Sequence, residues 1–254
     1  MKHIYALLVV FLVFSCKNEQ PSKALTAKDI VNKSIEVSGG HLFDSSSVVV
    51  IKFDFRDKSY KASHTPDGRV LSRFMLRDND TILDFLKGNA FQRYINQVPV
   101  KVADSMIPRY SASVNSVHYF SVLPYGLNDK AVNKALIGEE QIKSKDYYKI
   151  KVTFNEEGGG EDFEDVFIYW VDKTTFKPDY LAYSYDEDDD KGMRFRVAYN
   201  ERYVNGLRFV DYDNYKPKRD ALPLVDIGNA FDTNNLELLS KIELENVEVE
   251  LIIK

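Results

Sequence analysis

Apolar residues recur at helical spacing near the start of the chain and alternate with polar ones farther on. Over residues 26–38 the apolar side chains fall mostly on one side of a helix, and Thr26 with Asp29 forms a capping-box pattern. Gly39 and Gly40 then end this helix. From Val48 the period is two, which is typical of a strand with one buried face. The pattern predicts one amphipathic helix followed by sheet.

Turn residues between alternating segments predict antiparallel strands joined by tight turns. Thr-Pro-Asp-Gly at 65–68 separates one pair of segments, and Gly88 separates another. Asn205–Gly206 is the strongest hairpin signal, because a two-residue turn of this type needs positive φ at both positions. The cross-strand pairs that this turn predicts are Val204–Leu207, Tyr203–Arg208 and Tyr199–Tyr212.

Residues 109–136 differ from the segments around them, because their apolar positions have helical spacing. Pro124 and Gly126 interrupt this segment, and Asn128 can cap a second short helix. Strands are expected again from Ile142 to the end. The patterns together predict a mainly β (α+β) chain. The strands are expected to form a single meandering antiparallel sheet, with an N-terminal helix and helices inserted midway.

The N-terminus predicts a lipoprotein signal peptide over residues 1–15. Its apolar run, residues 4–14, is shorter than the roughly 20 residues that span a bilayer. The run ends in Val-Phe-Ser-Cys, which resembles a bacterial lipobox, and in that family the cysteine is acylated. Cys16 is the only cysteine, so its lipidation would leave no thiol to mispair. The alternative is a free buried cysteine in an ordinary secreted protein.

Residues 16–25 predict a lipidated N-terminus with a polar tether, and residues 26–254 a single β-rich domain. Lys-Asn-Glu after the cysteine loosely resembles the export signals of surface lipoproteins in Bacteroidota. We therefore expect an outer-membrane lipoprotein of the cell envelope, facing either the periplasm or the cell surface. Its N-terminal lipid makes the membrane its first partner. A net charge of −5 speaks against nucleic acid as a partner.

The order of elements resembles the lipoprotein-carrier architecture of LolA and LolB. In that family an incomplete β-barrel wraps around helices and holds acyl chains in an apolar cavity. The resemblance implies that this chain forms an open antiparallel half-barrel with the midway helices on its concave face. Three segments also resemble a family of uncharacterised lipoproteins from Bacteroidota, which brings no residue role with it. These segments are SVHYFSVLPYGLNDKAV (116–132), GGGEDFEDVFIYWVD (158–172) and RFRVAYNERYVNGLRFVDYDNY (194–215).

Two acidic segments could bind cations. Residues 156–165 place six carboxylates around three glycines, and residues 186–192 alternate aspartates as an EF-hand loop does. In the second segment the glycine falls one place late and Val197 replaces the twelfth-position glutamate. Solvated hairpin tips are the simpler interpretation of both segments. No metal site is predicted.

Sequence motifs of catalysis are absent. Of the four histidines, His41, His64 and His118 follow the signal peptide, far apart and in no metal-binding pattern. No nucleophile elbow, P-loop or dinucleotide fingerprint occurs. Paired carboxylates could serve a glycosidase, but 39 acidic residues make some such pair inevitable. No catalytic residue and no cofactor is predicted.

Aromatic residues give the one candidate binding site. Sixteen tyrosines and sixteen phenylalanines cluster in a few segments, and residues 166–171 are apolar on both faces of a strand. Core packing accounts for such a pattern. A tyrosine-rimmed apolar pocket would account for it too. The candidate lining residues are Tyr119, Phe120, Tyr125, Tyr169 and Tyr183.

Three functions remain from these patterns. The first is a non-enzymatic, membrane-anchored protein that binds a lipid or another apolar ligand. The second is a carboxylate-based hydrolase acting on envelope or extracellular polymers, which needs two acidic side chains facing each other across a cleft. The third is a scaffold for other envelope proteins, which needs an exposed apolar patch.

Overall fold

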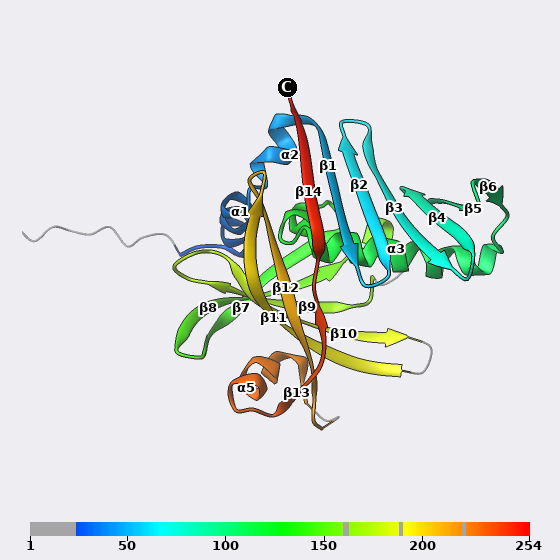
Figure 1. Ribbon diagram of the computed structural model, residues 1–254. Coiled ribbons are helices and arrows are strands. Elements are labelled where there is room, and N and C mark those ends of the chain that lie inside the picture. Colours follow the sequence, from blue (N-terminus) through cyan, green and yellow to red (C-terminus); the bar gives the residue numbers. More distant parts are fainter. Residues whose placement is uncertain (1–23, 160–162, 188–189, 220–221) are drawn as a thin grey trace, which may run out of the picture.

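The computed structural model describes residues 24–159, 163–187, 190–219 and 222–254. Cys16, the signal-peptide residues 1–15 and most of the predicted tether lie outside these ranges. The described strands form two open, entirely antiparallel sheets of seven strands each, here called sheet A and sheet B. Figure 1 shows sheet A above sheet B, with the helices at the sides and between them.

The two sheets divide the chain unevenly. Sheet A has, in spatial order, β14 (Glu245–Ile253), β1 (Ser46–Phe55), β2 (Lys58–Thr65), β3 (Gly68–Arg77), β4 (Asp80–Lys87), β5 (Ala90–Ile95) and β6 (Val98–Val100). Sheet B has β13 (Leu236–Ile242), β12 (Leu207–Pro217), β11 (Asp190–Val204), β10 (Pro178–Glu187), β9 (Val166–Asp172), β8 (Lys145–Phe154) and β7 (Val132–Ile142). Only the last strand returns to the first sheet.

The predicted architecture is confirmed in class. The chain is mainly antiparallel β with an N-terminal helix and a helical segment midway, and neither sheet closes into a barrel. The single meandering sheet was wrong, because the midway helices carry the chain from sheet A to sheet B. The helices are α1 (Ala27–Val37), α2 (His41–Ser45), α3 (Ile107–Ser121), α4 (Glu156–Gly159) and α5 (Ile227–Asp232), with short 3₁₀ turns η1 (Asp104–Met106), η2 (Tyr125–Asn128) and η3 (Leu224–Asp226).

Helix α1 begins with the predicted capping box. The Thr26 hydroxyl accepts a hydrogen bond from the Asp29 amide, and the Asp29 carboxylate accepts one from the Thr26 amide. This exchange satisfies two amides that a helix start otherwise leaves open. Ile30 and Val31 are then completely buried against sheet B.

Helix α1 ends against the β11–β12 hairpin. Gly39 has φ +83°, and a Cβ there would overlap the carbonyl oxygen of Gly206 in the hairpin turn. The Arg208 amide donates to the Ser38 carbonyl at 3.1 Å, and the Tyr203 hydroxyl to the Val37 carbonyl at 2.9 Å. The glycine pair predicted to end the helix therefore also lets the helix approach the hairpin closely.

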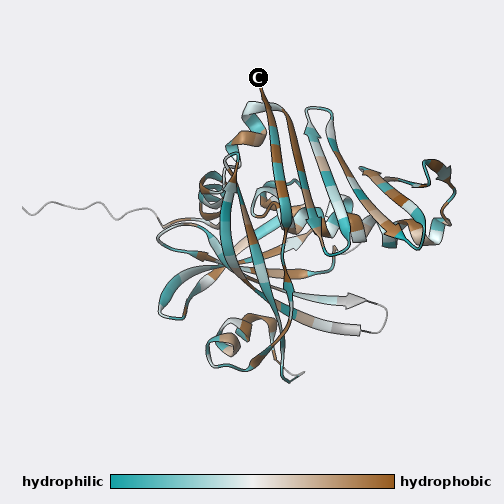
Figure 2. Cartoon of the chain, in the orientation of Figure 1, coloured by the Kyte–Doolittle hydropathy of each residue, from teal (hydrophilic) through white to brown (hydrophobic). Residues whose placement is uncertain are grey.

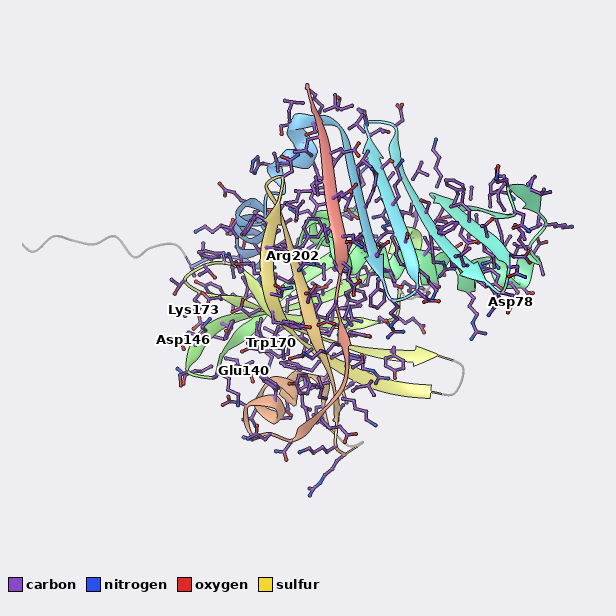
Figure 3. The ribbon with its side chains drawn as sticks, viewed as in Figure 1. Asp78, Glu140, Asp146, Trp170, Lys173 and Arg202 are labelled. Carbon is purple, nitrogen blue, oxygen red and sulfur yellow. The ribbon has the colours of Figure 1, made fainter. Side chains whose placement is uncertain are left out.

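Sheet B is covered on both faces. On one face α1, η2 and the end of α3 pack against residues such as Ile150, Tyr169 and Leu181. On the other face α5 packs against Trp170 and its neighbours. Trp170 donates its indole N–H to Glu140 at 2.9 Å, and the two side chains lie side by side in Figure 3. The strand predicted to be apolar on both faces is thus buried on both.

Sheet A has helix α3 on one face only. Figure 1 shows α3 crossing behind its strands. Val114 of α3 is completely buried against Leu71 and Leu86 of the sheet. His118 of the same helix is buried too, and its Nε2 donates to the Ser72 carbonyl at 3.0 Å. The opposite face of sheet A has no helix over it among the described elements.

The β11–β12 hairpin confirms two of the three predicted pairs. Asn205 and Gly206 both have positive φ, and Val204 faces Leu207 while Tyr203 faces Arg208. The Tyr199–Tyr212 pair was wrong, because a bulge between Tyr199 and Arg202 shifts the register by one. Tyr199 faces Asp211 instead, and Tyr212 faces Ala198.

A polar network holds this bulge. Asn200 has φ +49° and donates from its side chain to Asp211 at 2.6 Å. Arg202 donates to the same carboxylate at 3.1 Å and to the Leu244 carbonyl at 2.6 Å. Figure 3 shows Arg202 near the point where the two sheets meet. The bulge thus provides side chains that fix the passage from β13 to β14.

Two boundaries in the second half differ from the prediction. The strands resume at Val132 rather than at Ile142, so Asn128 ends the turn η2 and caps no second helix. Helix α5 also interrupts the late strands. With six residues, α5 is too short to give a helical period in sequence, and it is stabilised by packing on sheet B.

Candidate functional site

A cleft of about 350 Å³ opens where α2, the β2–β3 turn and the end of α3 meet. This volume lies in the range of roughly 300–1,000 Å³ typical of small-molecule sites. The apolar and aromatic lining residues are Phe43, Pro66, Tyr119, Val122 and Tyr125. The polar and small ones are Ser46, Ser47, His64, Thr65, Gly68, Arg69, Gly126, Asp129 and Lys254.

A stack of aromatic rings forms one wall of the cleft. Phe43 of α2 lies on Tyr125 of η2, with ring centroids 3.7 Å apart and ring planes 16° apart. The imidazole of His64 meets Phe43 edge-on at 5.0 Å. These rings come from three distant parts of the sequence, so the folded chain alone creates the wall. Flat rings of this kind accept apolar and aromatic groups of a ligand.

His64 is the neutral polar group of this wall. Burial, together with the smaller effect of the positive charge of Arg69, lowers its pKa to about 4. At neutral pH the imidazole therefore carries one donor and one acceptor nitrogen. No described side chain or backbone group forms a hydrogen bond with either nitrogen, and the ring lines the cleft. It can thus orient a polar group of a ligand.

Arg69 and Asp129 bring charge to the rim. Arg69 is exposed and donates to Asn115 at 3.1 Å, and it forms no ion pair with a described carboxylate. Desolvation raises the pKa of Asp129, and the nearby Arg69 lowers it in part. Among described residues, Asp129 is the single carboxylate side chain that lines the cleft. A mechanism with two facing carboxylates therefore has no second acid there.

The five aromatic candidates do not form one pocket. Of the five candidates, Tyr119 and Tyr125 line the cleft. Tyr169 is 1% exposed within the core of sheet B, and its hydroxyl lies 3.4 Å from that of Tyr119. Burial raises the pKa of Tyr119 to about 12. Phe120 and Tyr183 pack on each other with ring centroids 5.8 Å apart, and both are half-buried against the same core.

Sequence reasoning missed most of the cleft. Phe43 lies in a short helix that the pattern did not predict, and His64 and Arg69 flank a turn that gave only a hairpin signal. These residues show no common spacing, because the cleft is assembled by tertiary packing. The weak signal available was that His64 is the histidine nearest to a predicted turn.

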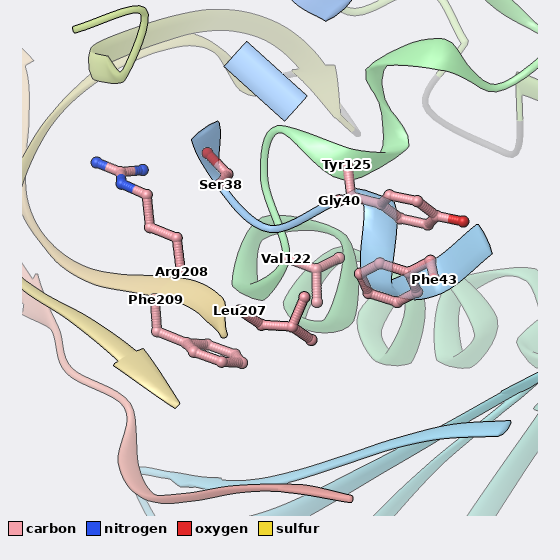
Figure 4. Close-up of a pocket in the computed structure, with 8 residues that line it drawn as sticks. All are labelled: Ser38, Gly40, Phe43, Val122, Tyr125, Leu207, Arg208 and Phe209. Carbon is pink, nitrogen blue, oxygen red and sulfur yellow. The ribbon is translucent and has the colours of Figure 1, made fainter. Parts of the chain in front are cut away.

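A second, much smaller cavity of about 10 Å³ lies beside the cleft (Figure 4). This is room for one water molecule. Phe43, Val122 and Tyr125 line this cavity as well as the cleft, and Leu207 and Phe209 close it. Ser38 and Arg208 also line it, and each has a buried polar atom without a hydrogen-bond partner. It holds no ligand larger than water.

The acidic segments provide no site in the described residues. Residues 156–159 form the short helix α4 between β8 and β9, while residues 160–162 and 188–189 lie outside the described ranges. Within those ranges no group of three or more histidine, cysteine, aspartate or glutamate side chains is placed to hold a metal ion. No described helix is long and apolar enough to cross a membrane.

Comparison with known proteins places the chain in a family. No curated protein matches it in sequence. Similar solved structures include a LolA superfamily protein from Nitrosomonas europaea, with 15% identity, 91% of this chain and 95% of that one covered, and a TM-score of 0.48. Another is a DUF1329 family protein from Desulfovibrio piger, with 14% identity, coverage of 90% and 95%, and a TM-score of 0.48.

A third similar structure is an outer membrane lipoprotein-sorting protein domain from Vibrio parahaemolyticus, with 9% identity, coverage of 87% and 93%, and a TM-score of 0.40. Bacteroidota origin and lipoprotein status remain predictions. The model of DUF6503, a family of unknown function, matches residues 2–244, and the chain therefore belongs to this family.

Proposed function

We propose that the protein is a lipoprotein of the outer membrane that binds an amphipathic small molecule in the cleft and catalyses no reaction. The observation that supports binding is the cleft itself, large enough for a small ligand and walled by stacked rings. Its polar groups stand at one side: the neutral imidazole of His64 and the Arg69 guanidinium, which lacks a carboxylate partner among described residues. Such a lining suits a molecule with an apolar body and a polar end.

Anchoring is the second part of the proposal. Acylation of Cys16 by two or more chains would hold the protein stably at the bilayer, since one chain binds only marginally. The tether of residues 16–25 would then keep the cleft near the membrane, where amphiphiles are concentrated. Cys16→Ser should abolish acylation, and mass analysis of the N-terminal peptide with membrane fractionation tests this. An unmodified thiol at Cys16 in the native protein would contradict anchoring.

Ligand binding can be tested with N-phenyl-1-naphthylamine, a neutral apolar dye that fluoresces on leaving water. Thr65 lines the cleft and is exposed, so Thr65→Trp should fill it without disturbing the core. Lys61→Trp is the matched control, because Lys61 is exposed on the same strand and does not line the cleft. We expect at least about tenfold weaker dye binding for the first variant alone, equal to about 1.4 kcal/mol.

Equal affinities of both variants would place dye binding outside the cleft. Native mass spectrometry of protein extracted from membranes supplies the second arm. A small molecule that co-purifies with the native chain and is lost in Thr65→Trp supports the proposal. A clean spectrum of unliganded native protein counts against it.

A scaffold function is the second candidate, and the uncovered face of sheet A favours it. Phe74 is 38% exposed and Leu76 64% exposed on this face. Leu83 faces Phe74 on the next strand, and Tyr94 faces Leu83 on the strand after that, so both continue the same row. Exposed apolar patches of several hundred Å² mark interaction sites. If the uncovered face of sheet A binds other envelope proteins, the double variant Phe74→Ser, Leu76→Ser should abolish their co-purification while leaving dye binding unchanged.

A further inference from the structure

Arg196 of β11 is a buried cation with no carboxylate partner among the described residues. Its exposed fraction is 8%, and no described carboxylate forms an ion pair with it. Its buried Nε has no hydrogen-bond partner. The other deeply buried arginines differ, since Arg73 pairs with Asp84 and Arg208 with Glu201. Buried charges are as a rule paired, so the lack of a partner for Arg196 among the described residues points to a bound anion.

Aromatic rings hold the Arg196 guanidinium in place. It lies 3.9 Å from the ring centroid of Phe120 and 5.1 Å from that of Tyr183. One terminal nitrogen donates to the Tyr183 hydroxyl at 3.0 Å. These contacts fix the plane of the guanidinium, as cation–π stacking does at anion-recognition sites, while neutralising none of its charge.

Arg194 extends this feature along the strand. It lies two residues before Arg196, and therefore on the same face of β11. Its guanidinium stands 5.0 Å from the Tyr185 ring centroid and donates to the Met193 carbonyl at 2.9 Å. It too forms no ion pair with a described carboxylate. Two arginines and two tyrosines thus alternate across one face of the β10–β11 hairpin.

We propose that Arg194 and Arg196 bind the acidic group, a phosphate monoester or carboxylate, of an amphiphile whose apolar part packs on the neighbouring rings. Two guanidinium groups on one strand face can each donate to such a group, and Arg offers paired donors that match its oxygens. The site is distinct from the cleft, which Arg194, Arg196, Tyr183 and Phe120 do not line.

The test is titration of the full chain with monododecyl phosphate below its micelle concentration, followed by calorimetry and by the ¹H–¹⁵N signal of the Arg196 Nε. Arg196→Lys assigns this signal. We expect the phosphate to shift it and to bind at least tenfold more weakly in Arg194→Gln and in Arg196→Gln. Arg77→Gln is the control, because Arg77 is an exposed strand arginine in sheet A. Dodecyl maltoside, a neutral amphiphile, should bind equally to all variants.

Inorganic phosphate separates the two sources of the anion. If it matches monododecyl phosphate in affinity and in the Arg196 shift, the site takes a free anion; if it is much weaker, the site takes an amphiphile. Equal affinity of monododecyl phosphate for the native chain and both variants, or binding without a shift at Arg196, would overturn the proposal. If Arg196→Gln does not fold, Arg194→Gln and the native-chain signal still decide it.

Discussion

Single residues set the closest contacts in this fold, and Gly39 is the clearest case. It combines φ +83° with a direct approach to the Gly206 carbonyl, so any side chain there meets backbone. Gly39→Ala should lower the free energy of unfolding by about 2 kcal/mol or more. Gly68→Ala is the control, because Gly68 also has positive φ but open space around it. Urea unfolding of both variants checks this, and equal losses would show that strain alone, without the clash, accounts for the effect.

His118 makes stability depend on pH. Burial lowers its pKa to about 4, against which the hydrogen bond to Ser72 acts in part. Protonation would charge Nδ1, which is buried without a partner. The unfolded chain binds this proton near pH 6.5 and the folded chain near pH 4. Above pH 6.5 this histidine therefore does not lower the free energy of unfolding. As the pH falls from 6.5 towards 4, the free energy of unfolding decreases by up to about 3 kcal/mol.

The pH dependence can be assigned to this histidine by substitution. His118→Gln should be less stable at pH 7 yet lose less stability between pH 6.5 and 4.5 than the native chain. His64→Gln should reduce the same slope, since burial lowers the pKa of His64 to about 4 too. His41→Gln, at an exposed position, is the control. Identical slopes in all four proteins, measured by chemical unfolding at each pH, would contradict this assignment.

At the scale of elements, a charge network joins α3 to sheet A. Asp84 is completely buried and accepts from Arg73 at 2.8 Å and from Arg93 at 2.7 Å. Arg73 also donates to the Ser113 hydroxyl of α3 at 2.7 Å. The Arg93 guanidinium lies 4.0 Å from the ring centroid of Tyr110 on the same helix. The helix is therefore docked by polar contacts as well as by Val114.

Replacing the Asp84 carboxylate, which Arg73 and Arg93 share, should weaken the packing of α3 on sheet A. Asp84→Asn leaves two largely buried guanidinium groups without a counter-charge, and we expect a loss of about 3–5 kcal/mol in unfolding free energy. Glu250→Gln breaks the exposed Lys52–Glu250 pair and should change stability very little. Thermal unfolding followed by circular dichroism compares the two. A small loss for Asp84→Asn would mean that solvent already reaches the arginines.

The elements themselves were largely predictable from sequence, and their partners were not. The α1 capping box, the turn at 65–68 and the positive φ at Asn205–Gly206 are local properties and came out as expected. The Tyr199–Tyr212 pairing failed because the bulge depends on Asp211 reaching Asn200 and Arg202 from the next strand. The cleft was missed for the same reason, since Phe43, His64 and Tyr125 meet only after folding.

At the scale of the whole molecule, β14 joins the last residues to the first strand. It alternates between hydrophilic and hydrophobic residues (Figure 2), and its inner side chains pack with those of β1 around Phe53. Removal of residues 245–254 should therefore leave β1 with an open edge and an uncovered core. We expect the shortened chain to aggregate in size-exclusion chromatography, since free edges pair with other chains. A monomer with native thermal stability would contradict this expectation.

The pairing of β1 with β14 also sets the order of events when the chain is made. Ser47 donates to the Ile252 carbonyl across 205 positions of sequence. A ribosome therefore makes β1 and its other neighbour β2 long before β14, the partner on the far side of β1, and contacts at such separation form slowly. Until β14 has been made, sheet A lacks the edge strand beside β1, and the polypeptide cannot complete its native fold.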